Sequence, residues 1–417
     1  MNELNKKPAG LPHWIIVFGR TTGAAVVTTL FTLVANVLIL RILPVVDAGR
    51  YALLISLAPM LALLGGFGQA ALLKRRYSLR PPGAFNWSRD LAGSLLFSAP
   101  GLLLSVLAAM LVYRLSPGSI VFLSLAAPLL VLSQATAGVL DSHRLYVWAG
   151  VLIRLPNSLM VIPAGAVLLL PGLADLWFFL AAQIAVIGVS VALGLLLLVR
   201  RVPRGPAVIS PRERAEGLSL GIMSGTNPLL SQGVIAVAGA IVPPGSLAAL
   251  AAIATLVRPV HLIHNLALGI LTVELARDRK LRRARVGWML GVGAVLLVLI
   301  LSACMPLLTR VAYGGRYQGF VGLGLPLVLI GGLLLTEILP RAYVKGSAAT
   351  SQLKRFALWQ VGIALCGVVM ILASSKSAGV VGATWAGVAI AVLRNLVAYL
   401  FYWSLTRSAP PPSATGT

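Results

Sequence analysis

Charged side chains are scarce in this sequence. They make up 11% of the 417 residues and only 10 of them are acidic, whereas 59% of the residues are hydrophobic. A soluble globular domain carries about 25% charged residues, and the mean hydropathy of +0.95 lies far from that balance. The composition therefore excludes an ordinary soluble domain and indicates an all-α integral membrane protein.

Cysteine and the motifs of soluble enzymes are also nearly absent. The two cysteines, Cys304 and Cys366, lie inside apolar segments, so the sequence indicates neither a disulfide framework nor a metal site. It contains no Walker loop, no G-x-G-x-x-G after a strand, no H-E-x-x-H and no C-x-x-C. We therefore expect a transporter without cofactor or metal rather than an enzyme, and an ATP-driven pump would need an ATPase on a separate chain.

The formal net charge of +24 and the pI near 11.4 have two readings. In a soluble chain they would favour nucleic-acid binding. Here the basic residues cluster between apolar segments, which is the pattern that orients a membrane protein. We therefore predict no nucleic-acid partner.

Twelve segments are long and apolar enough to cross a bilayer, which takes about 20 residues. They lie near 14–40, 50–73, 91–113, 118–140, 147–170, 174–199, 218–242, 246–273, 286–312, 319–340, 355–375 and 378–405. We expect residues 1–13 to precede the first helix, 14–199 to form a six-helix N-lobe, 200–217 to form a basic linker, 218–405 to form a six-helix C-lobe, and 406–417 to be a disordered tail.

Lysine and arginine predict the orientation. With the N-terminus inside, the inner segments hold 24 of the 34 basic residues and the outer ones 6, which leaves 4 within spans. Cytoplasmic loops carry the excess of positive charge, so we expect both termini in the cytoplasm. The two halves also align at an offset of 200 residues, with Pro44–Pro59 over Pro244–Pro259, as in transporters built from repeats.

The four basic residues within predicted spans are Arg20, Arg154, Arg258 and Arg394. A cation in hydrocarbon costs roughly 3 kcal/mol on insertion scales and usually faces a cavity or a partner. The arginines therefore predict a substrate path for an anion. The alternative for each is a structural role, either in a seam between helices or by reaching back to the interface.

Arg258 has the strongest case, because it lies near the middle of the segment 246–273. His261 and Asn265 follow three and seven residues later, on the same face of a helix. We predict that this face lines a cavity and binds anionic oxygens.

The other three arginines have weaker support. Arg20 lies about 9 Å into its segment, at 1.5 Å per residue, and the face that continues through Thr28, Thr32 and Asn36 favours a cavity over snorkelling. Arg154 precedes Pro156, where we expect a kink, whereas few polar residues lie near Arg394 in its segment.

Segment 218–242, the counterpart of 14–40, carries a polar stripe that includes Asn227. Acidic residues are scarce at depth, and Glu337 is expected near the cytoplasmic end of segment 319–340. Ion coupling is therefore unsupported by the sequence. An inside-negative potential could instead drive an anion outward, by about 2.3 kcal/mol per charge per 100 mV.

The stretch from Arg41 to Ser78 resembles the N-terminal region of bacterial polysaccharide and O-antigen flippases, of the multidrug/oligosaccharidyl-lipid/polysaccharide exporter superfamily. The matching elements are Arg41, Gly49 with Tyr51, Gly66 with Gly68, and the basic exit at 74–76. The turn reads Leu-Pro-Val at 43–45 instead of the usual Leu-Gly-Pro. Residues 310–329 resemble the same family more weakly, through Gly314 and Tyr317.

The resemblance implies two six-helix lobes around a cation-lined cavity in a bacterial inner membrane. The implied substrate is an undecaprenyl-pyrophosphate-linked oligosaccharide, flipped to the periplasmic leaflet, with Arg20 and Arg258 placed by helix position at the pyrophosphate. Partners would be membrane lipids, the anionic lipid-linked substrate and a glycan polymerase or chain-length regulator. The alternatives are a small-molecule exporter of the same superfamily and a membrane-embedded glycan polymerase or ligase.

Overall fold

The computed structural model describes residues 13–78, 83–211, 213–214, 232–277, 283–347 and 350–407. These residues are almost entirely helical, and the strand-like pairing among them is an isolated bridge between Phe85 and Ala207. The elements are α1 (His13–Ile42), α2 (Val45–Gly65), α3 (Gln69–Ser78), α4 (Trp87–Tyr113), α5 (Pro117–Ser142), α6 (Tyr146–Ser158), α7 (Val161–Leu169), η1 (Pro171–Leu173), α8 (Leu176–Arg201), α10 (Pro244–Arg277), α11 (Arg283–Tyr313), η2 (Gln318–Leu323), α12 (Gly324–Ser347) and α13 (Thr350–Arg407).

These elements confirm the predicted all-α membrane fold of about twelve helices. Within the described ranges, nine helical segments are long and apolar enough to cross a membrane, and the 34-residue α10 lies alongside them. Most of the predicted segment 218–242 lies outside the described residues, and its end, residues 232–238, is helical.

Two predicted spans are broken by local backbone chemistry. Segment 50–73 divides into α2 and α3 at Gly66–Gly68, where Phe67 and Gly68 have φ of 44° and 67°. The predicted kink near Pro156 is confirmed, because α6 ends at Ser158 and α7 begins at Val161. Pro163 contributes to this break, since it has no N–H to continue the helix.

A further break, at the predicted boundary between segments 355–375 and 378–405, divides α13 into two antiparallel arms. Ala378 and Gly379 leave helical geometry, with φ of 57° at Gly379, which a glycine adopts without strain. The rings of Phe356 and Phe401 then lie 5.2 Å apart. Residues 350–377 and 380–407 therefore form the last two crossings, as predicted from the boundary at 375–378.

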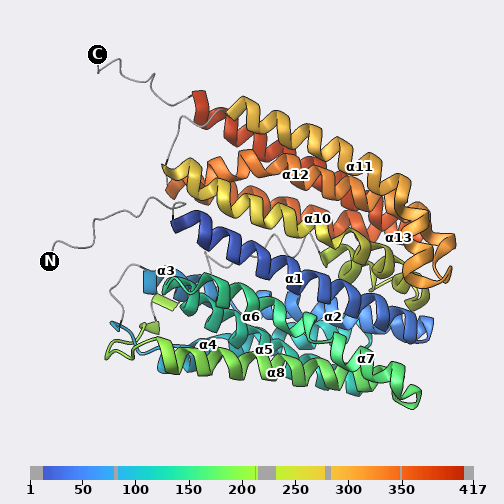
Figure 1. Ribbon diagram of the computed structural model, residues 1–417, viewed down its shortest axis with the longest axis horizontal. Coiled ribbons are helices and arrows are strands. Elements are labelled where there is room, and N and C mark those ends of the chain that lie inside the picture. Colours follow the sequence, from blue (N-terminus) through green and yellow to red (C-terminus); the bar gives the residue numbers. More distant parts are fainter. Residues whose placement is uncertain are drawn as a thin grey trace.

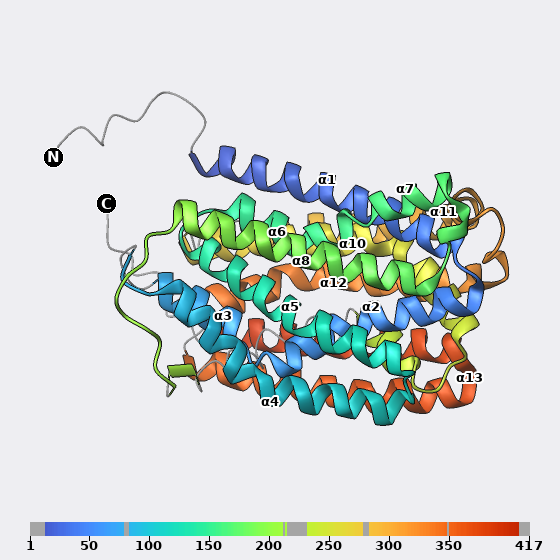
Figure 2. The ribbon, with the colours of Figure 1, turned by 90° about the horizontal axis from the view of Figure 1, so that it is seen from below.

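The helices form two lobes with roughly parallel axes (Figure 1). The elements α2–α8 lie on one side and α10–α13 on the other, while α1 runs along the boundary and packs on α6, α7 and α10. Among the described residues, the larger apolar cluster runs through both lobes, and a smaller one lies within the N-terminal lobe at the end of the bundle where α3 and α4 meet the linker. The first turn of α1 and the last turn of α13 lie at the same end of the bundle (Figure 2).

At the opposite end, the lobes are joined by hydrogen bonds from side chains to backbone. We call these contacts the distal seam. Tyr113 of α4 donates to the carbonyl of Ala236 (2.9 Å), and Tyr317 donates to the carbonyl of Leu40 at the end of α1 (3.0 Å). Arg316 donates to the carbonyl of Arg41 (2.8 Å).

The distal seam also requires a glycine at the start of α2. A Cβ built on Gly49 would lie 1.8 Å from the carbonyl oxygen of Pro244, and one built on Gly245 would lie 3.5 Å from Val45. Val45 and Gly245 are equivalent positions in the 200-residue alignment of the two halves. The lobes therefore meet through corresponding segments of the two halves.

At the end where the termini lie, the linker is bound to the N-terminal lobe by Asp90. This carboxylate is fully buried and accepts hydrogen bonds from Arg214 (2.9 Å), from the backbone N–H of Ile209 (2.8 Å) and from Tyr77 (2.9 Å). Burial and the neighbouring carboxylate raise the pKa of the Tyr77 hydroxyl, so that this group stays protonated and donates.

Candidate functional site

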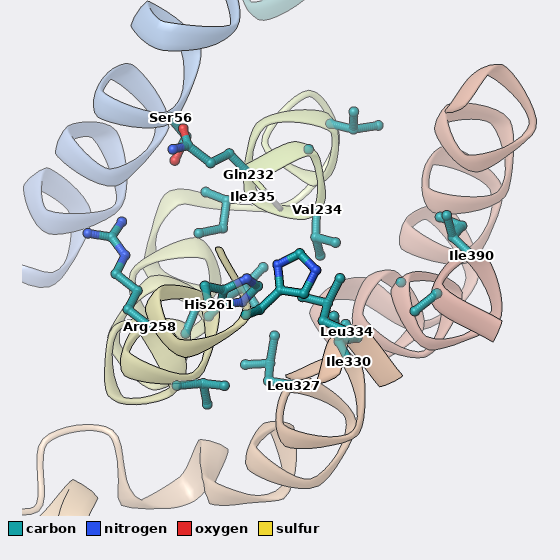
Figure 3. A pocket seen from close by; sticks show the side chains of 18 of the residues that line it. Ser56, Gln232, Val234, Ile235, Arg258, His261, Leu327, Ile330, Leu334 and Ile390 are labelled. Atoms are coloured by element: carbon teal, nitrogen blue, oxygen red, sulfur yellow. The ribbon is translucent and has the colours of Figure 1, made fainter. Parts of the chain in front are cut away.

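A cavity of about 440 Å³ lies between the two lobes near the middle of the bundle. Its walls come from α1, α2 and α6 on one side and from residues 232–237, α10, α12 and α13 on the other. Its size falls within the roughly 300–1,000 Å³ that is usual for small-molecule sites. Most of the wall is aliphatic, and a few polar groups interrupt it (Figure 3).

Among the described residues of the wall, three guanidinium groups line this cavity, from Arg154, Arg258 and Arg394, and no carboxylate does. Arg154 belongs to the N-terminal lobe, and the other two belong to the C-terminal lobe. All three residues were predicted from separate spans of the sequence. The fold brings them to one cavity with a positive wall.

Arg258 projects from α10 next to Pro259. Figure 3 shows its side chain extending toward the blue helices of the N-terminal lobe. Among the described residues it has no hydrogen bond or ion pair, and the neighbouring ionisable groups are the phenols of Tyr51 and Tyr313 and the imidazole of His261. Its charge is therefore not neutralised by any carboxylate that the structure describes, which favours an anionic ligand.

Arg154 is half-buried on α6. One terminal nitrogen donates to the carbonyl of Gly150 in the preceding turn (2.9 Å), a neutral acceptor that leaves the charge uncompensated. Asn157 lies one turn later on the cavity wall and accepts from Gln183 at 3.5 Å. Arg154 thus offers a second cation, from the opposite lobe to Arg258.

Arg394 differs from the other two, because it is paired. Its Nε donates to Oε1 of Glu337 on α12 (2.9 Å), and both side chains are buried. The expectation that Glu337 lies near the end of its helix is wrong, because α12 continues to Ser347. The carboxylate instead lies within the C-terminal lobe.

Arg341 lies one residue beyond the predicted segment 319–340, and the structure places it inside α12. Its side chain is 2% exposed, and its Nε lies 3.0 Å from the same Glu337 oxygen. Sequence analysis missed this group of three. The i, i+4 spacing of Glu337 and Arg341 was the available signal, but periodicity alone could not supply Arg394 from another helix.

The remaining predicted residues divide into three groups. His261 lines the cavity, together with His264 one turn later. Asn36 is not among the residues of this wall, and its amide donates to the carbonyl of Thr32 in its own helix (2.8 Å). The side chains of Arg20 and Asn265, and all of Asn227, lie outside the described residues.

The wall also contains further polar residues. Thr32, on the α1 face that was predicted to line a cavity, lies on the wall together with Thr29, while Ser56 of α2 and Gln232 face the cavity from the two lobes. Helical periodicity from Arg20 correctly indicated that one face of α1 is polar. It could not say where along that face the cavity ends.

Comparison with known proteins gives similarity at the level of structure. No family model matches the sequence, and no curated protein matches it. The lipid II flippase MurJ in an inward closed conformation is similar with a TM-score of 0.64 and 14% identity, over 95% of this chain and 88% of that one. An inward-facing multidrug resistance MATE family transporter of the MOP superfamily is similar with a TM-score of 0.59 and 13% identity, over 92% and 96%.

A MATE transporter in complex with MaD5 is similar to the same degree, with a TM-score of 0.63 and 13% identity, over 94% of this chain and 96% of that one. These similarities span nearly the whole of every chain. Because the sequence identity is so low, they establish a shared fold and no more. The protein has the two-lobed helical membrane fold that MATE transporters share with the flippase MurJ.

Proposed function

We propose that this protein is a transporter that flips an anionic, lipid-linked oligosaccharide across the membrane by alternating access. The substrate class is an undecaprenyl-pyrophosphate-linked glycan for polysaccharide or O-antigen synthesis, moved from the cytoplasmic to the periplasmic leaflet. No chemical step on the substrate is involved.

One observation carries this proposal: the cavity between the lobes is lined by three guanidiniums and, in its described part, by no carboxylate. A guanidinium presents N–H groups in a planar fork that matches phosphate oxygens. Arg154 and Arg258 come from different lobes, so a pyrophosphate between them would contact both moving parts.

The fold supports the same conclusion. MurJ, a lipid II flippase by name, is among the similar structures, and the Arg41–Ser78 stretch resembles polysaccharide flippases. The distal seam joins the lobes at one end of their boundary, and closure at one end at a time is what alternating access requires of a carrier. We place both termini in the cytoplasm, in a bacterial inner membrane, from the distribution of lysine and arginine.

A small-molecule exporter is the second candidate, because the MATE transporters are as similar in structure as MurJ. The largely aliphatic wall would also suit such substrates. An organic cation would have to approach three arginines without a described carboxylate in the wall. The charge of the cavity therefore favours the anionic glycan lipid.

The test is the fate of lipid-linked oligosaccharide when the gene is deleted. We expect glycan-loaded lipid carrier to accumulate on the cytoplasmic leaflet, measured by enzymatic labelling of sealed inverted and right-side-out vesicles. Re-expression of the wild-type protein should restore labelling on the periplasmic side. Equal leaflet distributions with and without the gene, together with altered drug sensitivity, would favour the exporter. Co-purification of a glycan polymerase or chain-length regulator would test the expected partners.

A further inference from the structure

The group formed by Arg341, Glu337 and Arg394 has an unbalanced charge. Two guanidiniums share one carboxylate oxygen, at 3.0 Å from Arg341 and 2.9 Å from Arg394. All three residues are at most 3% exposed. With both arginines and the glutamate ionised, the group carries one net positive charge inside the C-terminal lobe.

The two arginines contact Glu337 differently. Arg394 makes an aligned hydrogen bond, whereas Arg341 makes an ion pair without that alignment. Among the described residues, Nε and Nη1 of Arg341 have no hydrogen-bond partner, and neither does Oε2 of Glu337. Buried polar groups are normally paired. The hydrogen-bonding capacity of this group is therefore not fully used by the group itself.

Only one member of the group reaches the cavity. Arg394 lies on the wall, whereas Glu337 and Arg341 do not. The neighbouring residue fixes the position of Arg394, because Asn395 donates to the carbonyl of Leu333 (2.8 Å) and accepts from Thr336 (3.0 Å), both on α12. The excess charge behind the wall can therefore act on the cavity through a guanidinium held in place.

We propose that Arg341, Glu337 and Arg394 form an anion subsite of the cavity, in which Arg341 shares the Glu337 carboxylate and so leaves Arg394 able to bind a phosphate group. This inference rests on the proposed function and assigns Arg341 as a positioning residue that does not touch the substrate. Without Arg341, Glu337 would neutralise Arg394 as a one-to-one pair.

Four variants separate charge from packing. Arg341→Gln leaves a neutral Glu337–Arg394 pair, and Arg341→Gln with Glu337→Gln restores one net charge on Arg394. Arg341→Lys keeps the charge with another shape and guards against a folding defect in the first variant. Arg355→Gln is the matched control, because Arg355 is exposed near the start of α13.

The measurement is the affinity of the purified full-length protein for farnesyl pyrophosphate in detergent, with farnesol as the uncharged control. We expect Arg341→Gln to bind farnesyl pyrophosphate about tenfold more weakly. A unit positive charge roughly 10 Å from an anion raises the affinity for that anion by about this factor at an effective dielectric constant of about 20. The lysine variant, the double variant and the Arg355 control should stay within about threefold of the wild type.

Recovery of affinity in the double variant is the decisive result, because a residue with a purely structural role would not be rescued by removal of its partner. An unchanged affinity in Arg341→Gln overturns the inference, as does a double variant that stays as weak as the single one. Loss of binding in Arg258→Gln tests the proposed function separately. If the wild type binds farnesol and farnesyl pyrophosphate equally, both proposals fail.

Discussion

Removal of two hydroxyl groups from the distal seam should shift the protein toward a state that is open at that end. Tyr113 and Tyr317 each donate one hydrogen bond from one lobe to a backbone carbonyl of the other, at 2.9 and 3.0 Å. The double variant Tyr113→Phe with Tyr317→Phe keeps both rings and deletes both bonds. Arg316 is not substituted, because its side chain is exposed and solvent screening makes its contribution to the stability of the closed seam small.

The expected magnitude follows from the two bonds. A neutral hydrogen bond contributes about 1 kcal/mol net, so the pair contributes about 2 kcal/mol in favour of the closed seam. This corresponds to a change of roughly 30-fold in the population of the open state. The backbone carbonyls gain access to water on opening, so the loss falls on the closed state alone.

The assay is the labelling of a cysteine in the cavity from the side of the distal seam. Thr32 lines the cavity, and Thr32→Cys in a protein with Cys304→Ala and Cys366→Ala gives a single reactive thiol. A membrane-impermeant maleimide applied on the seam side should react up to about 30-fold faster in the double phenylalanine variant.

The control is Tyr146→Phe, which removes a hydroxyl from an exposed tyrosine at the start of α6. It should leave the labelling rate unchanged. If the double phenylalanine variant folds normally and labels at the wild-type rate, these hydrogen bonds do not hold the seam closed and the reasoning is refuted.

Three further substitutions test the site and its supports. Arg258→Gln should weaken binding of farnesyl pyrophosphate by about 10- to 150-fold, the equivalent of about 1.5–3 kcal/mol for hydrogen bonds to a charged group, and unchanged affinity would exclude Arg258 from the site. Asp90→Asn should lower the thermal unfolding midpoint in detergent, because it leaves Arg214 buried without its counter-charge at a cost of about 3–5 kcal/mol; an unchanged midpoint would contradict this. Gly49→Ala should prevent closure of the seam, seen as faster labelling in the same assay, whereas Gly291→Ala, which meets nothing within 4 Å, should not.

Hydropathy and loop charge were sufficient to predict the helices, because the cost of exposing backbone to lipid leaves few alternatives to a continuous helix. The turn in α13 and the break after Pro156 were also predictable, since both depend on residues with special backbone chemistry. Arg154, Arg258 and Arg394 could be named because a cation is conspicuous in an apolar segment.

What periodicity could not provide was the partner of each polar group. It shows which face of a helix is polar and says nothing of what another helix places opposite. Glu337 and Arg394 are 57 residues apart in sequence, so their pairing follows from the packing of α12 against α13. Thr32 and Asn36 share one predicted polar face and both bond to their own helix, but of the two it is Thr32 that lies on the described cavity wall.

The division of the guanidiniums between the lobes links binding to movement. In the proposed alternating-access cycle, Arg154 would move with one lobe and Arg258 and Arg394 with the other, so rocking of the lobes would change the separation of the cations that line the cavity. Affinity then differs between conformations, and a ligand shifts the equilibrium toward the conformation that binds it better. The bound anion would hold the lobes together like a clamp, and the empty carrier, whose like charges repel, would relax toward wider separation.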